Sequence, residues 1–184
     1  DVGSLFATPE EVARQAIEAG ASIINDISGG ENDSGMLNTI QQLGVPYIAM
    51  HSRGNSLTMN ELTQYEKLPD DIIQWFREQL KKYSVAGIKD IIIDPGIGFA
   101  KNAEQNFELI KQLKSFEILG KPIMIGVSHK RFIYNSLNVS VEESLNGTTA
   151  MHMACLMNGA SILRVHDVKE AVETTKLFMK IKGI

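Results

Sequence analysis

Polar side chains gather at five points of this sequence, and each group ends a short apolar run. The groups are Asn25–Asp26, His51–Arg53, Asp94, Ser128–Lys130 and Arg164–Asp167. Together they supply carboxylates, an amide, an ammonium group, guanidinium groups and imidazoles. These are the residue types that bind and polarise a substrate through hydrogen bonds and charge.

The apolar runs before these groups have the pattern of buried parallel strands. They span about residues 21–27, 45–51, 90–96, 122–128 and 160–167, and they are nearly all apolar rather than alternating. Helical patterns lie between and after them, at 10–19, 36–43, 69–87, 107–116, 131–137, 141–157 and from 167 onward. This alternation predicts an α/β fold built from βαβ units around a parallel sheet.

Two architectures fit such a sheet. One is a complete five-stranded, doubly wound open sheet, and the other is a (β/α)8 barrel represented by about its last five βα units. The runs begin about 35 residues apart on average, so eight units would approach the size of a barrel. A barrel draws its active site from many strand ends, whereas an open sheet uses mainly one switch point. Five polar strand ends out of five favour the TIM barrel, as a single domain over residues 1–184.

Composition excludes several classes of protein. The 184 residues carry a formal charge of −4, which argues against a nucleic-acid partner. No apolar run approaches the ~20 residues that span a bilayer, so we expect no membrane association. Cys155 is the only cysteine of the sequence, which predicts a reducing, cytoplasmic location and a small core side chain on a helix.

Several motifs occur in a characteristic order along nearly the whole chain. They are Ile23–Gly30, Met50-His51-x-x-Gly54, Asp94–Asn102, Gly126-Val-Ser128-x-Lys130, Asn146–Ala150 and Arg164–Val168. In these motifs the chain resembles the dihydropteroate synthase family. The resemblance implies a TIM barrel, a homodimer, Mg²⁺ as cofactor, and two small-molecule substrates. These substrates are 7,8-dihydropterin-6-ylmethyl diphosphate and 4-aminobenzoate, which the family joins with release of diphosphate.

The resemblance assigns a pterin site to the middle of the chain. Asp94 and Asn25 are expected to hydrogen-bond the flat pterin ring, and Met50 to pack against it. Lys130 is expected to contact pterin and to shape the aminobenzoate pocket, which Phe99 lines. Structural alternatives remain open, because Asp94 could belong to a turn, Asn25 to a helix cap, Met50 to the core and Lys130 to the solvated surface.

A diphosphate site is expected near the end of the chain. Arg164 and His166 flank Val165, so in an extended strand both side chains point the same way. A guanidinium and an imidazole that face one point suit a diphosphate group. Gly126 and Ser128 are expected to border the substrate. The structural alternative is an ion pair between Arg164 and Asp167 or a nearby Glu.

The mechanism that the resemblance implies needs no protein nucleophile. The bond from carbon to diphosphate weakens, a pterin-stabilised cation develops, and the arylamine attacks it. Asp94 and Lys130 would act on the pterin, while Arg164, His166 and Mg²⁺ would take the charge of the leaving group. His51 is expected to hold a loop rather than to act in catalysis. Asp26 is expected either to act as a cap or to support the residues that touch the substrate.

The chain departs from the family pattern in two respects. The family's three earlier strands, with an Asn that helps to hold Mg²⁺, are not found, and a barrel sheet without them exposes two edges. We therefore expect this chain alone to be inactive or to associate. Also, His129 replaces an arginine and Arg131 replaces a serine near the aminobenzoate carboxylate. Arg131 either binds that carboxylate itself or changes the second substrate.

Two other functions remain open. One is a methyltetrahydrofolate-binding methyltransferase domain, which would have no diphosphate for Arg164 and His166 to hold. The other is a truncated, non-catalytic paralogue that serves as a partner subunit.

Overall fold

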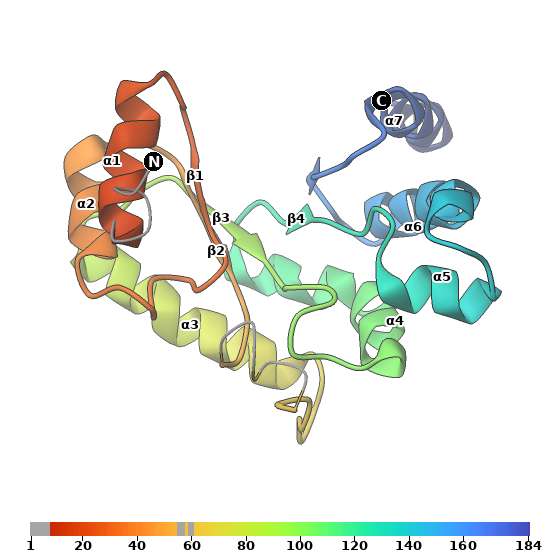
Figure 1. Cartoon of the computed structure of the whole chain (residues 1–184), viewed down its shortest axis with the longest axis horizontal. Helices are drawn as coiled ribbons and strands as arrows, with labels where there is room; N and C mark the ends of the chain where they lie inside the picture. The colour runs from red at the N-terminus through yellow and green to blue at the C-terminus, as the bar shows by residue number, and fades with distance from the viewer. Residues whose placement is uncertain (1–7, 55–57, 59–60) are drawn as a thin grey trace.

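The computed structural model describes residues 8–54, 58 and 61–184, and it alternates strands with helices (Figure 1). The elements in chain order are α1 (Pro9–Glu18), β1 (Ile24–Asp26), α2 (Met36–Leu43), β2 (Tyr47–Met50), α3 (Asp70–Val85), β3 (Ile91–Asp94), α4 (Ala103–Lys111), the 3-10 helix η2 (Leu113–Leu119), β4 (Met124–Ile125), α5 (Arg131–Leu137), the 3-10 helix η3 (Glu142–Ser144), α6 (Leu145–Met157), β5 (Ile162–Leu163) and α7 (Val168–Lys182). Each expected strand and helix is present.

Local signals explain where the helices begin and end. Thr8 accepts a hydrogen bond from Glu11 N at the start of α1. Asn102 and Gln105 form a capping box at the start of α4. Gly44 ends α2 in the left-handed conformation, with a φ of 62° that glycine adopts at no steric cost.

The strand order decides between the two architectures. β1, β2 and β3 pair in parallel in that order, a parallel bridge joins Ile93 to Ile123, and β4 pairs with β5. Consecutive strands are therefore neighbours throughout, without the reversal that a doubly wound sheet requires. Right-handed crossovers between strands in this order put every helix on the same side of the sheet. Figure 1 shows the result, an arc of strands with α3 and α4 along its outer side and with α1 and α7 at opposite ends.

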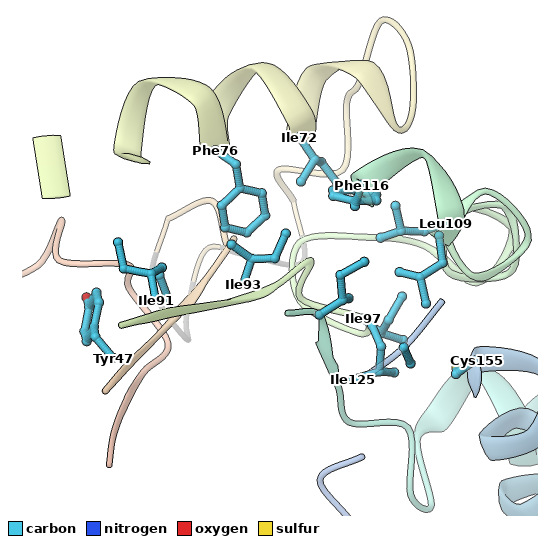
Figure 2. Close-up of a cluster of buried hydrophobic side chains, with 14 of the residues drawn as sticks. Tyr47, Ile72, Phe76, Ile91, Ile93, Ile97, Leu109, Phe116, Ile125 and Cys155 are labelled. Atoms are coloured by element: carbon cyan, nitrogen blue, oxygen red, sulfur yellow. The ribbon is translucent and has the colours of Figure 1, made fainter. Parts of the chain in front are cut away.

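The core lies between the sheet and these helices. Tyr47, Ile91, Ile93 and Ile125 project from the strands toward side chains of the helices, such as Phe76 on α3 (Figure 2). Cys155 on α6 is fully buried at the edge of this cluster, which confirms its expected core position. Each large side chain buried in this way stabilises the fold by about 1.5–3 kcal/mol.

The strand residues outside that cluster define the inner face of the arc. Ile48, Met50 and Met124 are buried but are absent from the outer core, and they alternate with residues that belong to it. Side chains of a strand point to opposite faces in turn. The registered pairs carry this alternation across the sheet, so the inner face takes Asn25, Ile48, Met50, Ile92, Asp94, Met124, Gly126, Ile162 and Arg164.

The last two strands differ from expectation. β4 and β5 have two residues each, and Ile162 of β5 is 37 % exposed rather than buried on both sides. Among the described residues β5 pairs only with β4, so one of its edges faces solvent. Within the same residues, no helix combines the length and the apolar character needed to cross a membrane.

Candidate functional site

The register brings five of the expected site residues to one face of the sheet. Asn25, Met50, Asp94, Gly126 and Arg164 all occupy inner positions at or just beyond the carboxyl ends of their strands. Met50 is the registered neighbour of Asp94. Residues from five different strands therefore meet at one edge of the arc, which is where barrel proteins place their ligands.

Asp94 is the most deeply buried charged residue of this edge. Its side chain is 4 % exposed and accepts a hydrogen bond from Gly96 N at 2.8 Å. Burial raises the pKa of Asp94 above its usual value, while the Gly96 hydrogen bond and the cations Lys130, Arg164 and Lys101 oppose that rise. Asp94 is thus the last residue of β3, its side chain binds the turn that follows, and three cations act on its carboxylate.

Lys130 lies across the loop that follows β3. Its Nζ donates to Ile97 O and lies 4.8 Å from the centre of the Phe99 ring. Burial lowers the pKa of Lys130 to about 8, although Asp94 opposes the shift. The surface interpretation of Lys130 is therefore wrong, because this side chain is part-buried and its ammonium binds Ile97 O beside the Phe99 ring.

Gly126 provides the surface on which Arg164 lies. A Cβ added at Gly126 would stand 3.0 Å from Arg164 Nη2 and 3.4 Å from its Cζ. The missing side chain leaves room for the guanidinium against the backbone just after β4, and its charge acts on Asp94. Asp167 does not pair with Arg164. It accepts from His129 Nε2 at 2.7 Å instead, so the alternative of an Arg164–Asp167 ion pair is wrong.

Ser128 acts on the segment that carries His166. The Ser128 hydroxyl accepts a hydrogen bond from His166 N and contacts His152 Nε2, both at 3.3 Å. The His166 side chain remains exposed beyond β5. Ser128 therefore fixes the backbone of His166 in this structure, while its own contact with a substrate stays a prediction.

His129 fastens the other side of the same segment. Its Nδ1 lies 2.7 Å from Ser144 Oγ, and its Nε2 binds the Asp167 carboxylate just before α7. Arg131 is the exposed first residue of α5, so its expected contact with a carboxylate remains untested.

The first strand end separates Asn25 from its neighbour Asp26. Asn25 is exposed on the inner face. Asp26 points outward, where it accepts from Ser28 N, Gly30 N and the Tyr47 hydroxyl, each at 2.8 Å. The expected turn-capping role of Asp26 is confirmed.

Sequence reasoning missed Lys101. This residue is 8 % exposed, and its Nζ lies 3.2 Å from His51 Nδ1, 3.0 Å from Gly96 O and 2.9 Å from Phe99 O. His51 is itself 2 % exposed, and its ring meets Trp75 edge-on at 5.0 Å. His51 therefore takes part in holding a loop. A lysine within a glycine-rich apolar loop was the available signal for Lys101.

The charge of the site favours an anionic ligand over a protein-bound metal. Lys101, Lys130 and Arg164 surround the single carboxylate of Asp94. Among the described residues, no three or more His, Cys, Asp and Glu side chains are placed to hold a metal ion together. A divalent cation at this edge would need ligands from the substrate or from water.

The fold defines the chain as an α/β protein whose polar and charged side chains gather at the carboxyl ends of successive parallel strands. A family model described as "Pterin binding enzyme" matches residues 6–166. The chain belongs to that family.

Known relatives agree with this assignment. The chain is 42 % identical over 177 residues to a dihydropteroate synthase of Synechocystis, and the match covers 95 % of this chain and 61 % of that protein. Among solved structures, dihydropteroate synthase from Thermus thermophilus in complex with 6HMPPP has a TM-score of 0.90 at 29 % identity, covering 96 % of this chain and 70 % of that one. The Xanthomonas albilineans enzyme with 4-aminobenzoic acid has a TM-score of 0.88 at 30 % identity, with 95 % and 63 % covered. The chain thus has the fold of five βα units of a dihydropteroate synthase barrel, and it spans about three fifths of the length of its curated relative.

Proposed function

We propose that this chain carries the pterin and diphosphate site of a dihydropteroate synthase. The reaction joins 7,8-dihydropterin-6-ylmethyl diphosphate to 4-aminobenzoate and releases diphosphate. The observation that carries the proposal is the placement of Asp94 and Arg164 at one edge of the sheet, where the guanidinium lies against Gly126 and its charge lowers the pKa of the carboxyl group. One molecule with a polar ring and an anionic tail fits that pair.

The chain's residues would divide the reaction between the two ends of the substrate. Asp94 accepts hydrogen bonds from the pterin ring and stabilises positive charge as the carbon–oxygen bond breaks. The electron pair of that bond leaves with diphosphate, whose added charge Arg164 and His166 receive. The amine nitrogen then forms the new carbon–nitrogen bond and releases its proton to solvent. Lys130 would contact the pterin from the opposite side.

The second substrate would lie near Phe99. The solved structure from Xanthomonas albilineans is that of the enzyme with 4-aminobenzoic acid. Phe99 supplies an aromatic face, Lys130 Nζ lies 4.8 Å from its centre, and Arg131 follows Lys130 as the first residue of α5. Such a set suits an aromatic carboxylate, so we assign the aminobenzoate pocket to this side of the site.

We include Mg²⁺ as the cofactor that would accompany diphosphate. Magnesium prefers oxygen ligands and commonly binds through substrate phosphates and water. The donors of this site fit a metal carried by the substrate, because Asp94 and Asn25 are the oxygen donors of the inner face and no larger cluster exists among the described residues. Bound there, Mg²⁺ would offset the charge of the leaving diphosphate.

We also propose that the protein is a cytoplasmic homodimer. The support for association is an exposed apolar face of α7, where Val168, Val172 and Met179 lie on one side of the helix and are each more than 40 % exposed. The sole cysteine, a buried free thiol at Cys155, suits a reducing compartment. Light scattering should give twice the 20.3 kDa of one chain, and a monomer at micromolar concentration would contradict the dimer.

Binding measurements test the site itself. A pterin ligand, titrated by calorimetry with and without pyrophosphate, should bind more tightly when pyrophosphate is present. Arg164→Ala should abolish the gain from pyrophosphate and leave pterin binding within about twofold, because Arg164 touches only the tail. Lys169→Ala, on the exposed first turn of α7, is the matched control and should keep the gain.

The same titration separates the other functions. A methyltetrahydrofolate-binding domain would bind the pterin without any response to pyrophosphate. A non-catalytic paralogue would bind neither ligand, and either result would reject the proposed function.

A further inference from the structure

Lys101 is a buried cation whose hydrogen-bonding capacity is fully used. Its ammonium has three hydrogens and three acceptors, which are Gly96 O at 3.0 Å, Phe99 O at 2.9 Å and His51 Nδ1 at 3.2 Å. Two of these acceptors belong to the loop between β3 and α4, and the third belongs to the residue after β2. Lys101 therefore joins the loop to a neighbouring strand end.

The backbone of this loop is in an unusual conformation and lies against the end of β2. Gly96 and Gly98 have φ values of 73° and 81°, and Ala100 adopts 50°, which a residue with a side chain rarely does. A Cβ at Gly96 would stand 2.0 Å from His51 O, so the loop lies directly on the end of β2. Without the ammonium, the Phe99 carbonyl would lose its donor and the Gly96 carbonyl would keep only Phe99 N, so the present shape of the loop would be less stable.

The two ends of this loop carry residues of the proposed site. Asp94 begins it, with Gly96 N bound to its Oδ1. Phe99 lies near its end, beneath Lys130. The distance between the pterin-binding carboxylate and the aromatic wall therefore depends on how the loop is folded.

We propose that Lys101 is a positioning residue, which clamps the Asp94–Lys101 loop onto His51 so that Asp94 and Phe99 face one substrate, and that loss of its proton loosens this clamp. The substrate part of this inference rests on the proposed function. The state of the loop does not, and it can be measured without ligand.

The protonation state of Lys101 would determine whether this clamp is closed. Burial lowers the pKa of Lys101 to about 7, which Asp94 partly opposes. Burial also lowers the pKa of His51 well below its usual value, so His51 is neutral and its Nδ1 can accept. A neutral Lys101 amine has two hydrogens for three acceptors, so above neutral pH either one contact is lost or the contact with His51 Nδ1 reverses, with the imidazole donating to the amine.

The groups that face Lys101 come from five places in the fold. They are His51 at the end of β2, Arg53 in the loop after it, Tyr65 before α3, Asp94 of β3 and Lys130 before α5. Arg53 and Lys130 repel the ammonium, and Asp94 is the one carboxylate of this set. Burial lowers the pKa of Lys101 to about 7 and that of Lys130 to about 8, so both lysines titrate near neutral pH.

Trp75 is a built-in reporter of the clamp. It is the only tryptophan of the sequence, and its ring meets the His51 ring edge-on at 5.0 Å. The emission of the ligand-free protein should change with a midpoint near pH 7. Lys101→Met should remove the transition. Lys101→Arg, which stays charged, should remove it as well. Lys130→Met should keep it, which assigns the titration to Lys101, and so should Lys114→Met on the exposed side of η2.

Pterin affinity provides the second readout. Lys101→Met should weaken binding about tenfold, equivalent to one charge-assisted hydrogen bond, and Lys101→Arg should recover part of the loss with no dependence on pH near 7. If Lys101 had only a structural role, both variants would be less stable, but their pterin affinities would not differ in this way. If Lys101→Met does not fold, hydrogen exchange of the wild-type amides of residues 96–101 decides, because their protection should fall above pH 7.

The outcomes are separable. The inference is overturned if the wild-type protein shows no emission or exchange transition near pH 7. It is also overturned if a folded Lys101→Met variant keeps that transition or binds pterin as tightly as the wild type. The expected loop transition together with a failure to bind pterin would instead overturn the proposed function and leave the clamp standing.

Discussion

Asp94 combines burial with an excess of neighbouring positive charge. Desolvation disfavours the carboxylate, and three cations restore part of its stability. A ligand that donates hydrogen bonds can bind such a group at little cost, because folding has already removed water from the carboxylate. The carboxylate should therefore contribute more to affinity than a surface aspartate would.

Asp94→Asn tests this contribution directly. The substitution keeps the shape and removes the charge, so pterin affinity should fall about ten- to a hundredfold, which corresponds to one or two charge-assisted hydrogen bonds. Wild-type affinity should also fall as the pH is lowered through the raised pKa of Asp94, because protonation removes the acceptor, and the variant should lack this dependence. Fluorescence titration from about pH 4 to pH 7 measures both effects.

Asp90→Asn is the matched control, since Asp90 lies exposed at the opposite end of β3. It should bind pterin as the wild type does. Equal affinity of Asp94→Asn and wild type would remove Asp94 from the site.

At the scale of elements, β4 and β5 are very short, yet they carry the proposed diphosphate site. Their pairing is continued by the hydrogen bond from Arg164 N to Ile125 O at 2.9 Å. Ser128 and His129 then hold the segment after β5 from two sides, through His166 N and the Asp167 carboxylate. The position of Arg164 thus depends on neighbours in β4 and beyond rather than on a long strand.

Gly126→Val should displace the Arg164 guanidinium, because even a Cβ would stand 3.0 Å from Nη2. We expect the gain in pterin affinity from pyrophosphate to fall about tenfold, while pterin binding alone is retained. Calorimetry on the double variant with Arg164→Ala supplies the control. If Gly126 acts through Arg164, the second substitution should add nothing to the loss. Additive losses would contradict this.

At the scale of the whole molecule, folding buries two lysines, Lys101 and Lys130, near the carboxyl ends of the strands. Burial lowers the pKa of Lys130 to about 8, against 10.5 for an ordinary lysine. Between these values the unfolded chain binds more protons than the folded chain, so the free energy of unfolding should rise with pH. Above about pH 10 the raised pKa values of Tyr47 and Tyr83 act in the opposite direction.

Urea denaturation from about pH 7 to pH 9.5 measures this dependence. Lys130→Met should remove roughly 1–3 kcal/mol of it, whereas Lys114→Met on the exposed side of η2 should not. An unchanged slope in Lys130→Met would show that Lys130 is hydrated in solution and does not carry the effect.

The sequence by itself determined the strands, the helices and the polar strand ends, because these follow from local periodicity and capping. It also placed Arg164 near the end of a parallel strand, and the family motifs identified Asp94 and Lys130. The tertiary structure alone decided the strand order, the pairing of His129 with Asp167 and the burial of Lys101. Those features depend on contacts between residues that are distant in the chain, such as the 50 positions between His51 and Lys101. Burial and pKa are set by everything packed around a group, and no local pattern of residues records that environment.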